Sequence, residues 1–192
     1  HTFSAVMSWA GCDRLSRIAH RLRLPDREQH WREVADGMRD RILERAWNER
    51  RGAFVASFDD DHLDASVLLL PELGLLPATD PRFLATLDVI GRELRDGDLL
   101  FRYRHEDDFG TPQTAFATCA FWYVNALAAA GFVEEAREHF TRLLRYRNGV
   151  GLLSEDIAPA TGELWGNFPQ TYSLVGVISS ALRLSRPWET TL

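Results

Sequence analysis

Several features that mark specialised classes of protein are scarce in this chain of 192 residues. Cysteine occurs only twice, as Cys12 and Cys119. Each lies in an uncharged, helix-like segment, so we expect two buried free thiols in a reducing compartment. Basic residues are outnumbered by acidic ones, 22 to 28, which leaves no electrostatic reason to expect a nucleic-acid partner. No secretory signal is visible, and we therefore expect a cytoplasmic protein.

Long apolar runs are lacking as well. The least polar segment, residues 111–130, still contains Gln113, Thr114, Thr118 and Asn125. Its apolar part is short for a bilayer, so we expect no interaction with a membrane.

The motifs that hold metals, nucleotides or a serine nucleophile are also missing. The sequence has no HExxH, no pair of CxxC motifs, no GxSxG and no P-loop, and residues 149–151 lack the third glycine of a dinucleotide loop. The acidic run 59–61 and Asp64 could suggest calcium, but the glycine and the distal glutamate of an EF-hand are not in register. An acidic helix start that suits the helix dipole is the simpler interpretation. We expect neither a metal nor another cofactor.

What the chain does contain is an alternation of two kinds of helical segment. Three segments are amphipathic, with apolar residues at helical spacing: 27–46, 81–95 and 134–147. Four are almost free of charge: 2–11, 63–70, 111–130 and 167–182. A helix that is uncharged all round must be covered all round, so the alternation predicts an inner and an outer layer of helical hairpins. We expect an all-α chain of about seven helices, with short extended pieces at 54–58 and 99–103.

The loops that precede the uncharged segments concentrate polar and aromatic residues. They are residues 1–4, 58–64, 102–109 and 154–170. If the uncharged helices form an inner ring, these loops gather at one end of it and would suit a polyhydroxylated ligand. The chain starts with His1 rather than Met, directly in a helical pattern, and we infer a fragment or a processed product of a longer protein.

Three segments carry a family resemblance: FRYRHEDDFG (101–110), AFATCAFWYVNALAAAGFVEEAREHF (115–140) and GLLSEDIAPATGELWGNFPQTYS (151–173). They resemble the glucoamylase-like glycoside hydrolases of family 15, which include glucodextranases and some bacterial trehalases. The match covers almost the whole chain, and the combination of FW after the cysteine, SED and GNFPQ is specific. The resemblance implies an (α/α)6 toroid of six inner and six outer helices. This chain would then be a single partial catalytic domain over 1–192, the C-terminal part of the toroid.

The resemblance also implies roles for individual residues. Family members are inverting enzymes with two glutamates, and Glu155 matches the general base by its position in the motif. The general acid would lie upstream of this chain. Arg102, Tyr103 and Asp107 resemble the loop that holds the sugar, with a surface ion-pair loop as the alternative. Tyr172 falls where the family places an aromatic residue beside the base.

Two further candidates have equally plausible structural roles. Trp165 is either a wall of the sugar site or part of the core. Asp64 lies on an otherwise uncharged segment, where it either binds substrate or forms a hydrogen bond to a helix end. Many relatives carry a histidine where this chain has Leu174, which leaves both glucoamylase and trehalase open as the subclass.

We therefore expect part of an inverting, exo-acting α-glycosidase that releases glucose from an α-glucan, a maltooligosaccharide or a trehalose-like substrate. The isolated chain should be inactive because its acid is missing. A non-catalytic toroid that binds carbohydrate or serves as a scaffold is the alternative. Part of a toroid exposes the flanks of its inner helices, so we also expect a homodimer or a complex with the missing N-terminal half.

Overall fold

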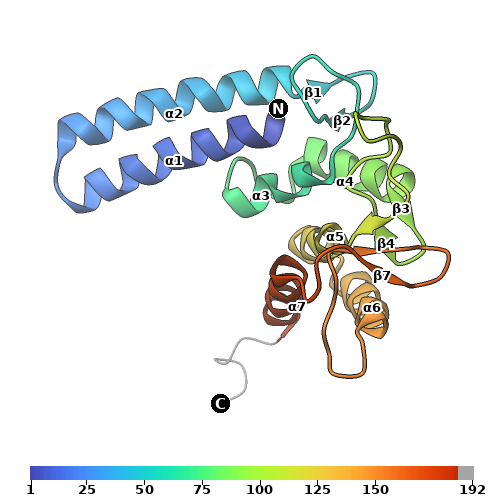
Figure 1. Ribbon diagram of the computed structural model, residues 1–192. Helices are drawn as coiled ribbons and strands as arrows, with labels where there is room; N and C mark the ends of the chain where they lie inside the picture. Colours follow the sequence, from blue (N-terminus) through green and yellow to red (C-terminus); the bar gives the residue numbers. More distant parts are fainter. Residues whose placement is uncertain (186–192) are drawn as a thin grey trace. The chain divides into compact units, whose positions relative to one another are not determined.

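The computed structural model describes residues 1–185, which fold into helices joined by very short strands (Figure 1). The α-helices of this part are α1 (Thr2–Arg21), α2 (Pro25–Arg45), α3 (Leu70–Leu73), α4 (Pro81–Glu93), α5 (Ala117–Ala129), α6 (Val133–Leu143) and α7 (Thr171–Leu184). Its 3₁₀ helices are η1 (Ala65–Leu69) and η2 (Leu144–Tyr146). Its strands are β1 (Trp47–Asn48), β2 (Ala53–Phe54), β3 (Arg95–Asp96), β4 (Leu99–Leu100), β5 (Ala115–Phe116), β6 (Asp156–Ile157) and β7 (Leu164–Trp165).

The chain divides into two compact units, His1–Thr86 and Leu87–Leu192. Helix α4 contains the boundary between them. The expectation of a single partial catalytic domain over 1–192 stays a prediction.

The first unit is built on a hairpin of α1 and α2, which lie side by side in Figure 1. The turn between them contains Arg23 in the left-handed region, with a φ of +58°. Pro25 then opens α2, where the missing N–H of proline does no harm. Asp13 on α1 is only 2% exposed. Its carboxylate forms ion pairs with Arg17 Nε and with Arg32 Nη1, each at 2.9 Å. Because Arg32 belongs to α2, its ion pair with the buried Asp13 ties the two helices together.

In the second unit α6 and α7 pack against α5 (Figure 1). Helix α5 has no charged residue and buries nine of its 13 residues, as expected for a helix that is covered on most of its sides. Helix α7 approaches it closely at Gly176, where a Cβ atom would come within 2.6 Å of the Phe121 ring. A larger residue at this position would push the two helices apart.

Most of the expected segments are helices. In the segment 167–182 the helix α7 begins only at Thr171, and two other segments differ more. Residues 63–70 do not form one regular α-helix but the 3₁₀ helix η1 followed by the beginning of α3. In the segment 111–130 the helix begins only at Ala117, because β5 pairs with β6 just before it. That pairing engages backbone groups that a longer helix would need for its own hydrogen bonds. The extended pieces expected at 54–58 and 99–103 contain part of β2 and all of β4.

Helices α1 and α7 each expose apolar side chains along one side. Along α1 and its C-cap these are Met7, Leu15, Ile18 and Leu22, and along α7 they are Tyr172, Val175, Ile178 and Leu182, each between 42% and 69% exposed. Exposed flanks of this kind were expected of inner helices. Association with a second copy or with further helices stays a prediction.

The cysteines and the longest helices bear on two more expectations. Cys119 is buried, as expected, whereas Cys12 is only partly buried, and neither forms a disulfide bond. The cytoplasmic setting stays a prediction. Within residues 1–185, no helix combines the length and the apolar composition that crossing a bilayer would take.

The buried histidine His139 should make the free energy of unfolding of the second unit depend on pH. The imidazole is 1% exposed on α6, and burial, followed by the positive charge of Arg142, lowers its pKa from 6.5 to about 4. Between these values the unfolded chain binds a proton that the folded chain does not, so stability falls as the pH drops from 6.5 towards 4. We expect a loss of about 2 kcal/mol between pH 7 and pH 5 from this group.

Urea unfolding at pH 7 and pH 5 measures this loss. His139→Gln removes the titrating group, and its stability should depend less on pH than that of the parent chain. His30→Gln changes an exposed imidazole and should leave the dependence as it is. Equal pH dependence in His139→Gln and the parent would contradict the assignment.

Candidate active site around Glu155

Glu155 lies where a small antiparallel sheet meets the start of α5. The strand order is β5–β6–β7, and Glu155 directly precedes β6. Its carbonyl oxygen accepts the N–H of Ala117, the first residue of α5, at 2.9 Å. Its own N–H donates to the carbonyl oxygen of Asn167 at 2.9 Å. The backbone of Glu155 is therefore held from two directions.

The carboxylate of Glu155 is held at one oxygen. Oε2 accepts two hydrogen bonds from Asn167, one from the side-chain Nδ2 at 2.8 Å and one from the backbone N–H at 3.2 Å. Gly166 makes this approach possible: it has a φ of +76°, and a Cβ at this position would come within 3.0 Å of both Cβ and Oε2 of Glu155. Oε1 accepts no hydrogen bond from residues 1–185. One oxygen thus orients the group while the other is free to act on a ligand.

Glu155 lines a cavity of about 470 Å³ in the second unit. The residues around it are Arg102, Tyr103, Asp107, Phe109, Gly110, Thr111, Pro112, Gln113, Thr114, Phe116 and Asp156. This volume lies in the usual range for small-molecule sites. The walls combine carboxylates, a guanidinium, an amide, hydroxyls and aromatic rings, a set that can bind both the hydroxyl groups and the C–H faces of a sugar.

The predicted sugar-binding loop forms one wall of the cavity and is held by Asp107. Asp107 Oδ2 accepts a hydrogen bond from the Tyr103 hydroxyl at 2.6 Å, and Oδ1 accepts one from the backbone N–H of Phe109 at 2.8 Å. The Tyr103 hydroxyl and the Phe109 N–H lower the pKa of Asp107, so this carboxylate is ionised near neutral pH. The Tyr103 ring stacks on His105 with centroids 4.6 Å apart. Arg102, Tyr103 and Asp107 therefore line the same cavity as Glu155, and their role in holding a sugar stays a prediction.

Three other predicted site residues do not line this cavity within the described part of the chain. Tyr172 lies in the first turn of α7 and is 68% exposed, and Trp165 lies in β7 and is 54% exposed. Asp64 belongs to the first unit, where its Oδ1 accepts the N–H of Ser66 at 2.7 Å and caps η1. This contact agrees with the alternative of a hydrogen bond to a helix end. Substrate binding by the three residues stays a prediction.

Several residues of the site were not singled out as candidates from the sequence, among them Asn167, Asp156, Thr114 and Phe109. Asp156 is half-buried, and its Oδ2 accepts the Thr114 hydroxyl at 2.9 Å. Burial raises the pKa of Asp156, and the charge of the adjacent Glu155 raises it further. The only sequence signal was that Asp156 and Asn167 belong to the SED and GNFPQ runs. Thr114 had no such signal.

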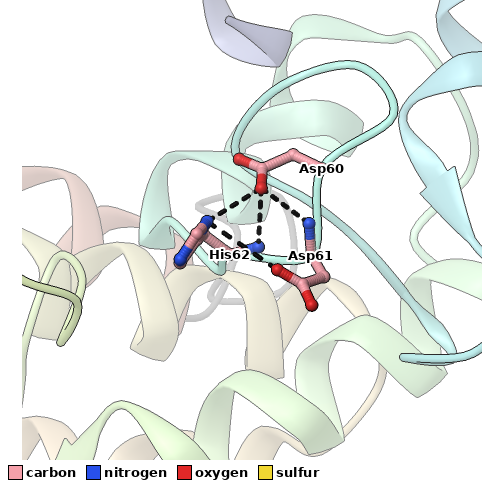
Figure 2. Close-up of side chains that lie close together, drawn as sticks. All are labelled: Asp60, Asp61 and His62. Carbon is pink, nitrogen blue, oxygen red and sulfur yellow. Dashed lines mark hydrogen bonds and ion pairs between the residues drawn. The ribbon is translucent and has the colours of Figure 1, made fainter.

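One group of potential metal ligands lies in the first unit (Figure 2). Among the described residues, Asp60, Asp61 and His62 are the three whose ligand atoms come within 4.8 Å of one another. They already bind one another or a neighbour: His62 Nδ1 lies 2.8 Å from Asp60 Oδ1, and Asp61 forms an ion pair with Arg50. We assign no metal site to this exposed turn. That the protein needs no metal stays a prediction.

Known proteins resemble this chain over nearly all of its length. The model of glycosyl hydrolases family 15 matches residues 1–182. A trehalase of Thermoplasma volcanium is 36% identical over 185 residues, which is 96% of this chain and 30% of the relative. A trehalase of Mycobacterium tuberculosis is 37% identical over 191 residues, 98% of this chain and 28% of the relative. The chain thus spans about 30% of the length of these curated relatives.

Several solved structures have a fold similar to that of this chain. A glycosidase in complex with glucose has a TM-score of 0.81 at 18% sequence identity. The match covers 96% of this chain and 52% of the glycosidase chain. A bacterial glucoamylase in complex with acarbose has a TM-score of 0.79 at 16% sequence identity. The match covers 96% of this chain and 33% of the glucoamylase chain. With its mostly helical structure, this similarity confirms the expected partial α/α toroid. By its match over residues 1–182 and its similarity to these trehalases, the chain belongs to glycosyl hydrolases family 15.

Proposed function

We propose that this chain carries the general base of an inverting α-glycosidase, that the base is Glu155, and that the substrate is a trehalose-like α-glucoside. The observation that carries the proposal is the Glu155 carboxylate itself, held by Asn167 at Oε2 and without a hydrogen-bond partner among residues 1–185 at Oε1, in a cavity lined by polar groups. The similarity to proteins named trehalase supports trehalose ahead of longer glucans.

In this proposal Oε1 of Glu155 takes a proton from a water molecule in the cavity. The oxygen of that water forms a bond to the anomeric carbon of the glucose while the glycosidic C–O bond breaks on the opposite face. A second carboxyl group, the general acid, delivers its proton to the departing oxygen. Arg102 and Asp107 hold the hydroxyl groups of the glucose that is attacked, with Asp107 kept in place by Tyr103.

The general acid is proposed to lie outside the described cavity. An inverting pair is about 6.5–9.5 Å apart, on opposite sides of the sugar. The other carboxyl groups that line the cavity are Asp107 and Asp156. Both oxygens of Asp107 already accept hydrogen bonds within its loop, and Asp156 directly follows Glu155 in the chain. The lowered pKa of Asp107 keeps it ionised near neutral pH, so it has no proton to deliver. We therefore place the general acid on another group.

Glucose release tests this proposal. We expect the 192-residue chain alone to release little or no glucose from trehalose or maltose, because one half of the acid–base pair is missing. A full-length enzyme carrying this chain should hydrolyse trehalose. Its first products should be one β-glucose and one α-glucose, because only the attacked ring inverts. Proton NMR in the first minutes distinguishes this from retention, which yields α-glucose alone. Rapid turnover by the isolated chain, or retained stereochemistry, contradicts the proposal.

A further inference from the structure

Phe109 has an unusual position for a large apolar residue. Its side chain is 98% exposed, yet it lines the cavity that contains Glu155. Other cavity residues, such as Thr114, Phe116 and Asp156, are half-buried. Phe109 therefore lies at the open end of the cavity, while these residues form its deeper part.

The turn that carries Phe109 is well held. Gly110 donates its N–H to the carbonyl oxygen of Asp107 at 3.0 Å and takes a φ of +94°, which closes the turn. The N–H of Phe109 donates to Asp107 Oδ1, and the opposite oxygen accepts the Tyr103 hydroxyl. The ring is thus presented on a turn whose backbone is fixed at three points, and little backbone freedom is lost when a ligand covers it.

An exposed aromatic ring at the mouth of a sugar cavity has a clear use. The face of the ring carries partial negative charge, and the C–H groups of a sugar carry partial positive charge, so the two can stack. Stacking also removes apolar surface from water. A glucose ring bound beside Glu155 fills the deeper part of the cavity, and a second ring attached to it extends towards the opening, where Phe109 lies.

We propose that Phe109 is the platform for the outer sugar of the substrate, the ring that leaves when the bond is cut. This inference rests on the proposed function, because it assumes that the bond beside Glu155 is the one hydrolysed. It makes Phe109 a determinant of substrate choice: substrates with a second sugar gain from the ring, and those without one do not.

Two substrates separate the outer ring from the rest of the site. Trehalose has a second glucose as leaving group, whereas α-glucosyl fluoride has only fluoride. In the full-length enzyme carrying this chain, Phe109→Ala should lower kcat/KM for trehalose by about tenfold, mainly through KM, and change the value for the fluoride by less than twofold. Phe109→Trp keeps an aromatic face and should stay close to the parent enzyme on both substrates. Val150→Ala removes another apolar side chain, 78% exposed and outside the cavity lining, and should change neither.

The outcomes separate this inference from the proposed function. If Phe109→Ala affects both substrates equally, or neither, or lowers the melting temperature by several degrees, the ring shapes or packs the protein and the inference is wrong. A parent enzyme that hydrolyses neither substrate overturns the proposed function, and the inference with it. A parent enzyme that hydrolyses both, with a loss confined to trehalose in Phe109→Ala, supports the two together.

Discussion

Replacing Glu155 by Gln in a full-length enzyme carrying this chain is expected to lower kcat for trehalose by about a hundred- to ten-thousand-fold, the usual range for a general base. Glutamine has nearly the same shape and can still accept hydrogen bonds from Asn167, but it cannot take a proton from water. KM should change little, because substrate binding depends mainly on other groups. Initial rates of glucose release over a range of trehalose concentrations give both constants.

Two comparisons make this result specific. Glu163→Gln makes the same chemical change on the same loop, at an exposed side chain outside the cavity lining, and should stay within twofold of the parent. In Glu155→Ala, added azide should restore activity and yield β-glucosyl azide, because azide is already an anion and needs no base. Near-normal hydrolysis by Glu155→Gln would show that another group activates the water.

Asn167→Asp is expected to have the second-largest effect, a loss of about 100-fold in kcat. The side-chain amide donates to Oε2 of Glu155 at 2.8 Å, and the substitution puts a carboxylate in its place. The favourable hydrogen bond becomes a repulsion between like charges, and the base turns away from its working position. Asn167→Ala removes the donor without adding charge, and we expect about a tenfold loss. The main-chain N–H of residue 167 remains in both variants.

The matched control is Gln170→Glu, which also changes an amide to a carboxylate on this loop. Gln170 is the N-cap residue of α7, where a negative charge suits the helix dipole, and it does not line the cavity. The full series Gln170→Glu, Asn167→Ala, Asn167→Asp should show rising losses in that order. Equal activity in Gln170→Glu and Asn167→Asp would mean that the amide does not position the base.

Much of the fold could be predicted from residues alone because helix patterns are local. The spacing of apolar residues in 81–95 and 134–147 anticipated α4 and α6 to within a few residues. The segments 63–70 and 111–130 were read as helices throughout, and the structure has η1 with α3 in the first and a helix only from Ala117 in the second. Composition favours a helix in both, but strand pairing with a distant segment decided where α5 begins.

The sequence by itself determined the helical class, the family and the identity of Glu155 as the candidate base, since these depend on periodicity and on motifs that are continuous in the chain. Only the tertiary structure decided which groups act together at the site. Asn167 reaches Glu155 across 12 residues, and Thr114 reaches Asp156 across 42. Such contacts follow from the register of β5, β6 and β7 and from the φ of Gly166. The hydrophobic pattern that usually sets a strand register is too short in strands of two residues, so here the register depends on how the distant segments pack.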